Sequence, residues 1–120
     1  MRRILIVDDE PSVRDVMATV LMDAGFSVLT AADGHIALEI IDDASPDLII
    51  TDVVMPNLDG WALLDHARER NPTLPIILMS AGDWIQARRT MPIPDHAVFL
   101  PKPFAIEELL ALVARLTGDP

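Results

Sequence analysis

Short uninterrupted apolar runs recur along the chain, separated by segments long enough to form helices. Four of these runs occupy residues 4–7, 48–50, 76–79 and 97–100. Each is too short for a helix and does not alternate with polar residues, which is typical of strands covered on both faces of a parallel sheet. A fifth stretch, residues 26–30, alternates partly between polar and apolar side chains, and this pattern favours a strand at the sheet edge.

Segments with helical periodicity lie between these runs. The first begins at Pro11, a residue suited to the first turn of a helix, and ends before Gly25. Spacings of three and four residues give it one apolar face, made of Val13, Val16, Met17, Val20 and Leu21. The same spacing between Ile106 and Leu116 predicts a final helix.

Two shorter helices are predicted at residues 34–42 and 59–70. Their inward-facing side chains should be Ile36, Ala37, Ile40 and Ile41 in the first, and Leu63, Leu64 and Ala67 in the second. Strands that alternate with helices predict an α/β fold with right-handed crossovers and three layers. The length of 120 residues fits one domain covering residues 1–120.

Residues 83–96 depart from this regular pattern. Pro92 and Pro94 end any helix near residue 90, so the fourth helix is expected to be short or irregular. Trp84 and Ile85 are candidate partner contacts in this segment. The alternative is that Trp84 simply covers a shortened helix.

Composition and charge narrow the possible functions. The chain has no cysteine, which excludes disulfides, thiolate catalysis and cysteine-bound metals. A formal charge of −10 disfavours direct binding to nucleic acid or to anionic membrane surfaces. No apolar run approaches the length of about 20 residues that a membrane-spanning helix needs, so a cytoplasmic protein is expected.

Polar residues follow the apolar runs at the positions where strands would end: Asp8, Asp9, Asp52, Ser80 and Lys102. The carboxyl ends of parallel strands meet at one edge of the sheet, where ligands bind in open α/β folds. Three carboxylates there would repel one another unless a cation neutralised them, and a set of oxygen ligands favours Mg²⁺. Each aspartate taken alone could equally cap a helix or form a turn.

Together these groups suit phosphoryl transfer. A carboxylate beside Mg²⁺ can attack phosphorus and form an aspartyl phosphate. The Lys102 ammonium and the Ser80 hydroxyl would then stabilise charge on the phosphoryl oxygens. The presence of all these groups at one edge of the sheet favours a reaction site over separate helix-capping or turn residues.

Four stretches carry a family resemblance: ILIVDDE at residues 4–10, LIITDVVMPNLDG at 48–60, IILMSA at 76–81 and FLPKPF at 99–104. Together they resemble the receiver domain of bacterial response regulators, and the resemblance covers essentially the whole chain. It implies a doubly wound, flavodoxin-like sheet of five parallel strands in the order 2-1-3-4-5. It also implies a signalling phosphoacceptor of a two-component or phosphorelay system, not an enzyme acting on external substrates.

The resemblance assigns the metal-binding and acceptor roles. Asp52 is expected to accept the phosphoryl group. Mg²⁺ is expected to be held by Asp8, Asp9 and Asp52 together with the main-chain carbonyl of Val54. Asp9 would bind the ion directly, and Asp8 partly through water.

The resemblance also assigns the residues that respond to phosphorylation. Ser80 and Lys102 would hold the phosphoryl group, and Ser80 and Phe99 would form the conformational switch. The bond between Lys102 and Pro103 is expected to be cis, which is accessible before proline.

The phosphoryl donor implied by the resemblance is a histidine kinase or a histidine phosphotransfer protein. The sequence does not identify the downstream partner. A stand-alone regulator, a phosphorelay intermediate and a receiver from a larger protein with an effector domain all fit the chain.

Two rival functions are compatible with an aspartate after a strand. A haloacid-dehalogenase-type hydrolase needs a second aspartate two residues beyond the nucleophile, where this chain has Val54. A pseudo-receiver, which is never phosphorylated, would lack a key residue, and none is missing. Val54 and Gly82 also offer no polar side chain to orient an attacking water, which predicts a long-lived aspartyl phosphate.

Overall fold

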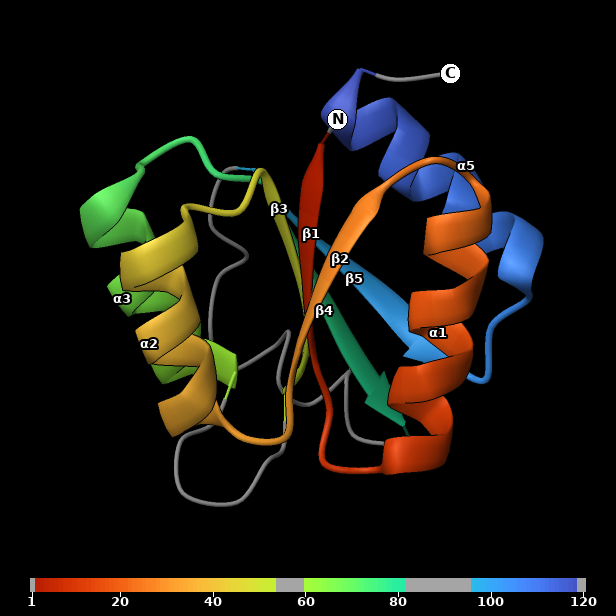
Figure 1. Cartoon of the computed structure of the whole chain (residues 1–120), viewed down its shortest axis with the longest axis horizontal. Coiled ribbons are helices and arrows are strands. Elements are labelled where there is room, and N and C mark those ends of the chain that lie inside the picture. The colour runs from red at the N-terminus through yellow and green to blue at the C-terminus, as the bar shows by residue number, and fades with distance from the viewer. Residues whose placement is uncertain (1, 54–59, 82–95, 119–120) are drawn as a thin grey trace.

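The computed structural model describes residues 2–53, 60–81 and 96–118. Within them lies one parallel sheet in the predicted order β2-β1-β3-β4-β5, built from β1 (Arg3–Val7), β2 (Ser27–Ala31), β3 (Leu48–Asp52), β4 (Ile76–Ala81) and β5 (Ala97–Lys102). The described helices are α1 (Pro11–Asp23), α2 (Gly34–Ala44), α3 (Gly60–Arg70) and α5 (Ile106–Thr117). Figure 1 shows α2 and α3 on one face of the sheet and α1 and α5 on the other, which confirms the three-layer α/β sandwich.

Some predictions concern residues outside the described ranges. These are the short fourth helix in residues 83–96, the candidate contacts Trp84 and Ile85, the Val54 carbonyl, and Gly82. They stay predictions. The edge position of the second strand, in contrast, is confirmed by the place of β2 in the sheet.

Alternate residues of the central strands point to opposite faces of the sheet, so each strand contributes to two cores. The core beneath α2 and α3 includes Leu5, Val7, Ile49, Ile76 and Leu78. The core beneath α1 and α5 includes Ile4, Ile6, Ile50, Ile77 and Met79. Burial on both faces explains why the apolar runs are uninterrupted.

The strands extend beyond the apolar runs that predicted them. β3 continues through Thr51 to Asp52, because main-chain pairing does not require an apolar side chain. Val7 at the end of β1 pairs with Thr51. Asp52 in turn pairs with Met79 of β4, so the carboxyl ends of the central strands are level with one another.

The helix ends follow the sequence signals. α1 begins at Pro11, and Gly25 shortly after its end has a φ of 100°. Gly118, which caps α5, has a φ of 76°. Glycine adopts this left-handed region without steric cost. None of the described helices has the length and apolar character needed to cross a membrane.

Three side chains on the predicted apolar helix faces are exposed, among them Ile106 of α5 at 45%. Val16 of α1 is 55% exposed, and Ile36 of α2, which was expected to face inward, is 41% exposed. The buried faces of these helices are formed by neighbouring positions, namely Met17, Ala18 and Leu21 in α1 and Ala37 and Ile41 in α2. The sheet contacts each helix along only part of its apolar face, so apolar side chains at the margin of that face stay exposed.

Candidate functional site

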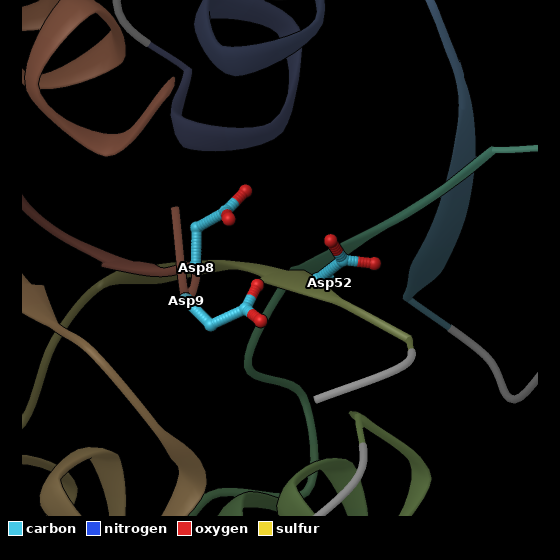
Figure 2. A group of neighbouring side chains, drawn as sticks. All are labelled: Asp8, Asp9 and Asp52. Carbon is cyan, nitrogen blue, oxygen red and sulfur yellow. The ribbon is translucent and has the colours of Figure 1, made fainter. Parts of the chain in front are cut away.

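The ends of β1 and β3 bring three carboxylates together. Asp8 and Asp9 follow Val7 of β1, and Asp52 follows Thr51 of β3. Val7 and Thr51 are paired in the sheet. One oxygen from each of Asp8, Asp9 and Asp52 lies within 4.8 Å of the others. Figure 2 shows the three side chains at this edge of the sheet. The convergence predicted from the strand order is therefore present.

The three carboxylates differ in burial. Asp8 is fully buried, the side chain of Asp52 is 15% exposed, and Asp9 is exposed. The Glu10 N–H donates to Oδ1 of Asp8 at 2.9 Å and fixes the orientation of that carboxylate. The site therefore has an anchored inner carboxylate and an outer one that faces solvent.

Lys102 supplies the positive charge of the site. Its ammonium lies 2.8 Å from Oδ2 of Asp52 and 3.4 Å from Oδ2 of Asp8. Since β4 lies between β3 and β5 in the sheet, the Lys102 side chain crosses over β4 to reach Asp52. The ammonium thereby partly neutralises the negative charge of the carboxylates.

The surroundings of Lys102 keep it charged. Burial alone would lower the pKa of its ammonium. The hydrogen bond and negative charge of Asp52, with a further contribution from Asp8, outweigh that effect and raise the pKa above its ordinary value of 10.5. Lys102 is therefore a cation throughout the neutral pH range.

The donor set fits a small hard cation. Around octahedral Mg²⁺, adjacent ligand oxygens lie about 3 Å apart and opposite ones about 4.2 Å apart. The three carboxylate oxygens lie within 4.8 Å of one another, so they could bind the ion after the side chains close around it, or with one carboxylate bound through water. Asp8, Asp9 and Asp52 could together hold the ion, while its remaining positions stay open to water or a phosphoryl oxygen.

The other predicted site residues lie on the neighbouring strands. Ser80 belongs to β4, where it pairs with Pro101. Phe99 belongs to β5 and is half-buried, and its ring contacts Trp61 of α3 edge to face at a centroid distance of 5.7 Å. The bond between Lys102 and Pro103 is cis, as the resemblance implies.

Arg14 is a site neighbour that the sequence did not single out. Its guanidinium donates a hydrogen bond of 2.9 Å to the main-chain carbonyl of Asp8. An arginine in the first turn of a helix that follows an acidic strand end was the available signal. That signal is weak, because surface arginines on helices are common.

A groove of about 370 Å³ lies between α1 and the beginning of α5. Its apolar lining includes Val13, Val16, Phe104 and Ile106, of which Val16 and Ile106 are 55% and 45% exposed. α1 starts two residues after Asp9, and Phe104 follows Lys102 by two residues. The groove, called the α1–α5 groove below, therefore adjoins the acidic site.

Comparisons with known proteins bear on the family and the fold of the chain. The family model of the response regulator receiver domain matches residues 4–114. A crystal structure of a response regulator receiver protein from Sinorhizobium medicae superposes with a TM-score of 0.89 at 31% identity, covering 98% of this chain and 94% of that one.

Two curated relatives are considerably longer than this chain. Response regulator MprA of Mycolicibacterium vanbaalenii is 40% identical over 121 residues, covering 98% of this chain and 52% of that protein. The DNA-binding transcriptional regulator NtrC of Klebsiella pneumoniae is 39% identical over 110 residues, covering 92% of this chain and 24% of that protein. The chain thus spans about half the length of the first relative and about a quarter of the second.

Proposed function

Because this chain belongs to the response regulator receiver domain family of two-component signalling, we propose that Asp52 is its phosphoacceptor. The observation that carries the proposal is the meeting of Asp8, Asp9 and Asp52 with the Lys102 ammonium at one edge of the sheet. We further propose that the receiver is the only domain in residues 1–120. Its catalysis would be limited to its own phosphorylation and dephosphorylation.

In the proposed reaction, an Asp52 carboxylate oxygen attacks the phosphorus of a phosphohistidine. The new O–P bond forms as the P–N bond breaks, and the electron pair of that bond stays on the imidazole nitrogen of the donor. A bound Mg²⁺ would neutralise charge on the phosphoryl oxygens. Asp8, Asp9 and Asp52, with the Val54 carbonyl, would hold the ion.

Lys102 has two successive partners in this proposal. Before the reaction its ammonium pairs with Asp52, and afterwards it would pair with the phosphoryl oxygens. Ser80 would supply a hydroxyl to the same group, and the Phe99 rotamer would change with it. These roles follow from the family and from the positions of the three residues on β4 and β5.

The proposed phosphoryl donor is a histidine kinase or a histidine phosphotransfer protein. The α1–α5 groove adjoins the acidic site and exposes Val16 and Ile106, which supports docking of the donor there. Trp84 and Ile85 are proposed contacts for the downstream partner, whose identity stays open.

The direct test is labelling with a small phosphodonor such as acetyl phosphate. The parent chain should incorporate phosphate only when Mg²⁺ is present, and Asp52→Asn should abolish the labelling. Asp23→Asn, which alters an exposed aspartate at the end of α1, is the matched control and should label like the parent.

Other outcomes would favour the rivals. Equal labelling of Asp52→Asn would remove Asp52 from the acceptor role. A parent chain that never labels would fit a pseudo-receiver, whereas steady hydrolysis of simple phosphate esters would fit a haloacid-dehalogenase-type hydrolase.

A further inference from the structure

Arg14 lies in the first turn of α1 and reaches back to the loop that carries Asp8 and Asp9. Its Nη1 donates the 2.9 Å hydrogen bond to the main-chain carbonyl of Asp8, and the contact is partly buried. Arg14 itself is of intermediate exposure. The bond therefore joins the helix to the loop at the edge of the carboxylate cluster.

The carbonyl that Arg14 contacts belongs to the peptide unit between Asp8 and Asp9. Because a peptide unit is planar, fixing its oxygen also constrains the Cα atoms at both of its ends. The Asp8 and Asp9 side chains in Figure 2 depart from those two Cα atoms. Rotation of this single peptide unit would displace both candidate metal ligands.

A side-chain N-cap does not hold this loop to the helix. Glu10, at the N-cap position of α1, makes no side-chain cap hydrogen bond. Its N–H instead donates to Oδ1 of Asp8. That bond orients the Asp8 side chain, whereas Arg14 holds the main chain from which Asp9 departs.

We infer that Arg14 is a positioning residue for Mg²⁺, and that its bond to the Asp8 carbonyl keeps Asp8 and Asp9 arranged to bind the ion. The inference rests on the proposed function, which assigns the ion to these carboxylates. Charge alone predicts the opposite effect, because a guanidinium beside three carboxylates weakens their attraction for another cation. The direction of change when Arg14 is removed therefore separates positioning from electrostatics.

The test is titration of Mg²⁺ alone into the full chain by isothermal calorimetry, with no phosphodonor present. Arg14→Met removes the donor and the charge, and we expect roughly tenfold weaker binding, the lower end of the effect of residues that orient metal ligands. Arg14→Lys, which keeps the charge and a donor, should bind Mg²⁺ more tightly than Arg14→Met. Arg115→Met, an exposed change of the same charge in the last turn of α5, should not weaken binding.

The inference is overturned if folded Arg14→Met binds Mg²⁺ as tightly as the parent or more tightly, or if Arg14→Lys loses as much affinity as Arg14→Met. Thermal unfolding reports whether each variant is folded. If Arg14→Met does not fold, Arg14→Gln replaces it under the same criterion. A parent chain that binds no Mg²⁺ contradicts the proposed function instead, so the two failures are distinguishable.

Discussion

Lys102 acts as the internal counter-ion of Asp52. Its pKa in the folded chain is raised above 10.5. The ion pair therefore stabilises the fold fully below the pKa of the unfolded side chain, and this stabilisation is lost as the pH rises through the folded value. At neutral pH, a metal ion entering the site must compete with this ammonium for the Asp52 and Asp8 oxygens.

Lys102→Met should bind Mg²⁺ roughly tenfold more tightly, because the lost charged hydrogen bond no longer competes with the ion. Labelling by acetyl phosphate should nevertheless slow, since no ammonium remains to neutralise the phosphoryl oxygens. Calorimetry measures the first effect, and labelling at saturating Mg²⁺ measures the second. Unchanged Mg²⁺ affinity would show that Lys102 does not compete with the ion. Arg115→Met again controls for the change in charge.

The sequence predicted the meeting of the carboxylates because Asp8, Asp9 and Asp52 come just after two buried apolar runs. Parallel strands end at a common edge, so their position along the chain was enough. The Lys102–Asp52 ion pair and the Arg14 hydrogen bond were not predicted. Both depend on the path of a long side chain toward residues distant in sequence or held in a loop, which no spacing rule specifies.

The layer formed by α1 and α5 has large apolar side chains on its solvent-exposed surface as well as in the core. Val16 and Ile106 are large and exposed, and they lie in the α1–α5 groove beside the acidic site. Contiguous exposed apolar surface is typical of a binding region. A protein donor seated there would contact α1, which begins two residues after Asp9.

Val16→Asp and Ile106→Asp should slow phosphoryl transfer from a purified histidine kinase that labels the parent chain. We expect the transfer rate to fall roughly tenfold or more, as it does when a hot-spot residue of an interface is lost. Labelling by acetyl phosphate should be unchanged, because a small donor needs no docking surface. Ile36→Asp, an exposed isoleucine on the opposite layer, is the matched control. Equal transfer rates in all the variants would exclude the groove as the docking site.

Sequence periodicity predicted the existence and order of the described helices and strands, but not their full extent or the exposure of each side chain. β3 runs to Asp52 because hydrogen-bonded pairing continues where apolar residues stop. Ile36 has the spacing of a buried residue, yet the sheet meets α2 along Ala37 and Ile41. Only the tertiary packing decides which side of the apolar stripe contacts the sheet.

The whole molecule carries a formal charge of −10, with three carboxylates gathered at one edge of the sheet. An ion that binds only the folded chain stabilises it in proportion to the logarithm of its concentration. Because the chain has an excess of negative charge, any dissolved salt also screens the repulsion among its carboxylates. A specific effect of Mg²⁺ must therefore be measured at constant ionic strength.

Mg²⁺ at tenfold excess over its Kd should raise the Tm by roughly 3–6 °C relative to NaCl of equal ionic strength. Asp9→Asn, which removes a proposed ligand with little loss of buried structure because Asp9 is exposed, should lose most of that increase. Differential scanning calorimetry gives both values, and chelation with EDTA should reverse the increase. The same Tm in Mg²⁺ and NaCl would argue against a metal site.

The ring contact between Trp61 and Phe99 joins α3 to β5. Indole fluorescence depends on the immediate surroundings of the ring, so a turn of Phe99 about its χ1 bond would alter the emission of Trp61. The chain has two tryptophans, and replacing Trp84 with phenylalanine leaves a single emitter. The protein thus contains a native optical reporter at the sheet edge farthest from β2, and motion there can be followed in real time without an added dye.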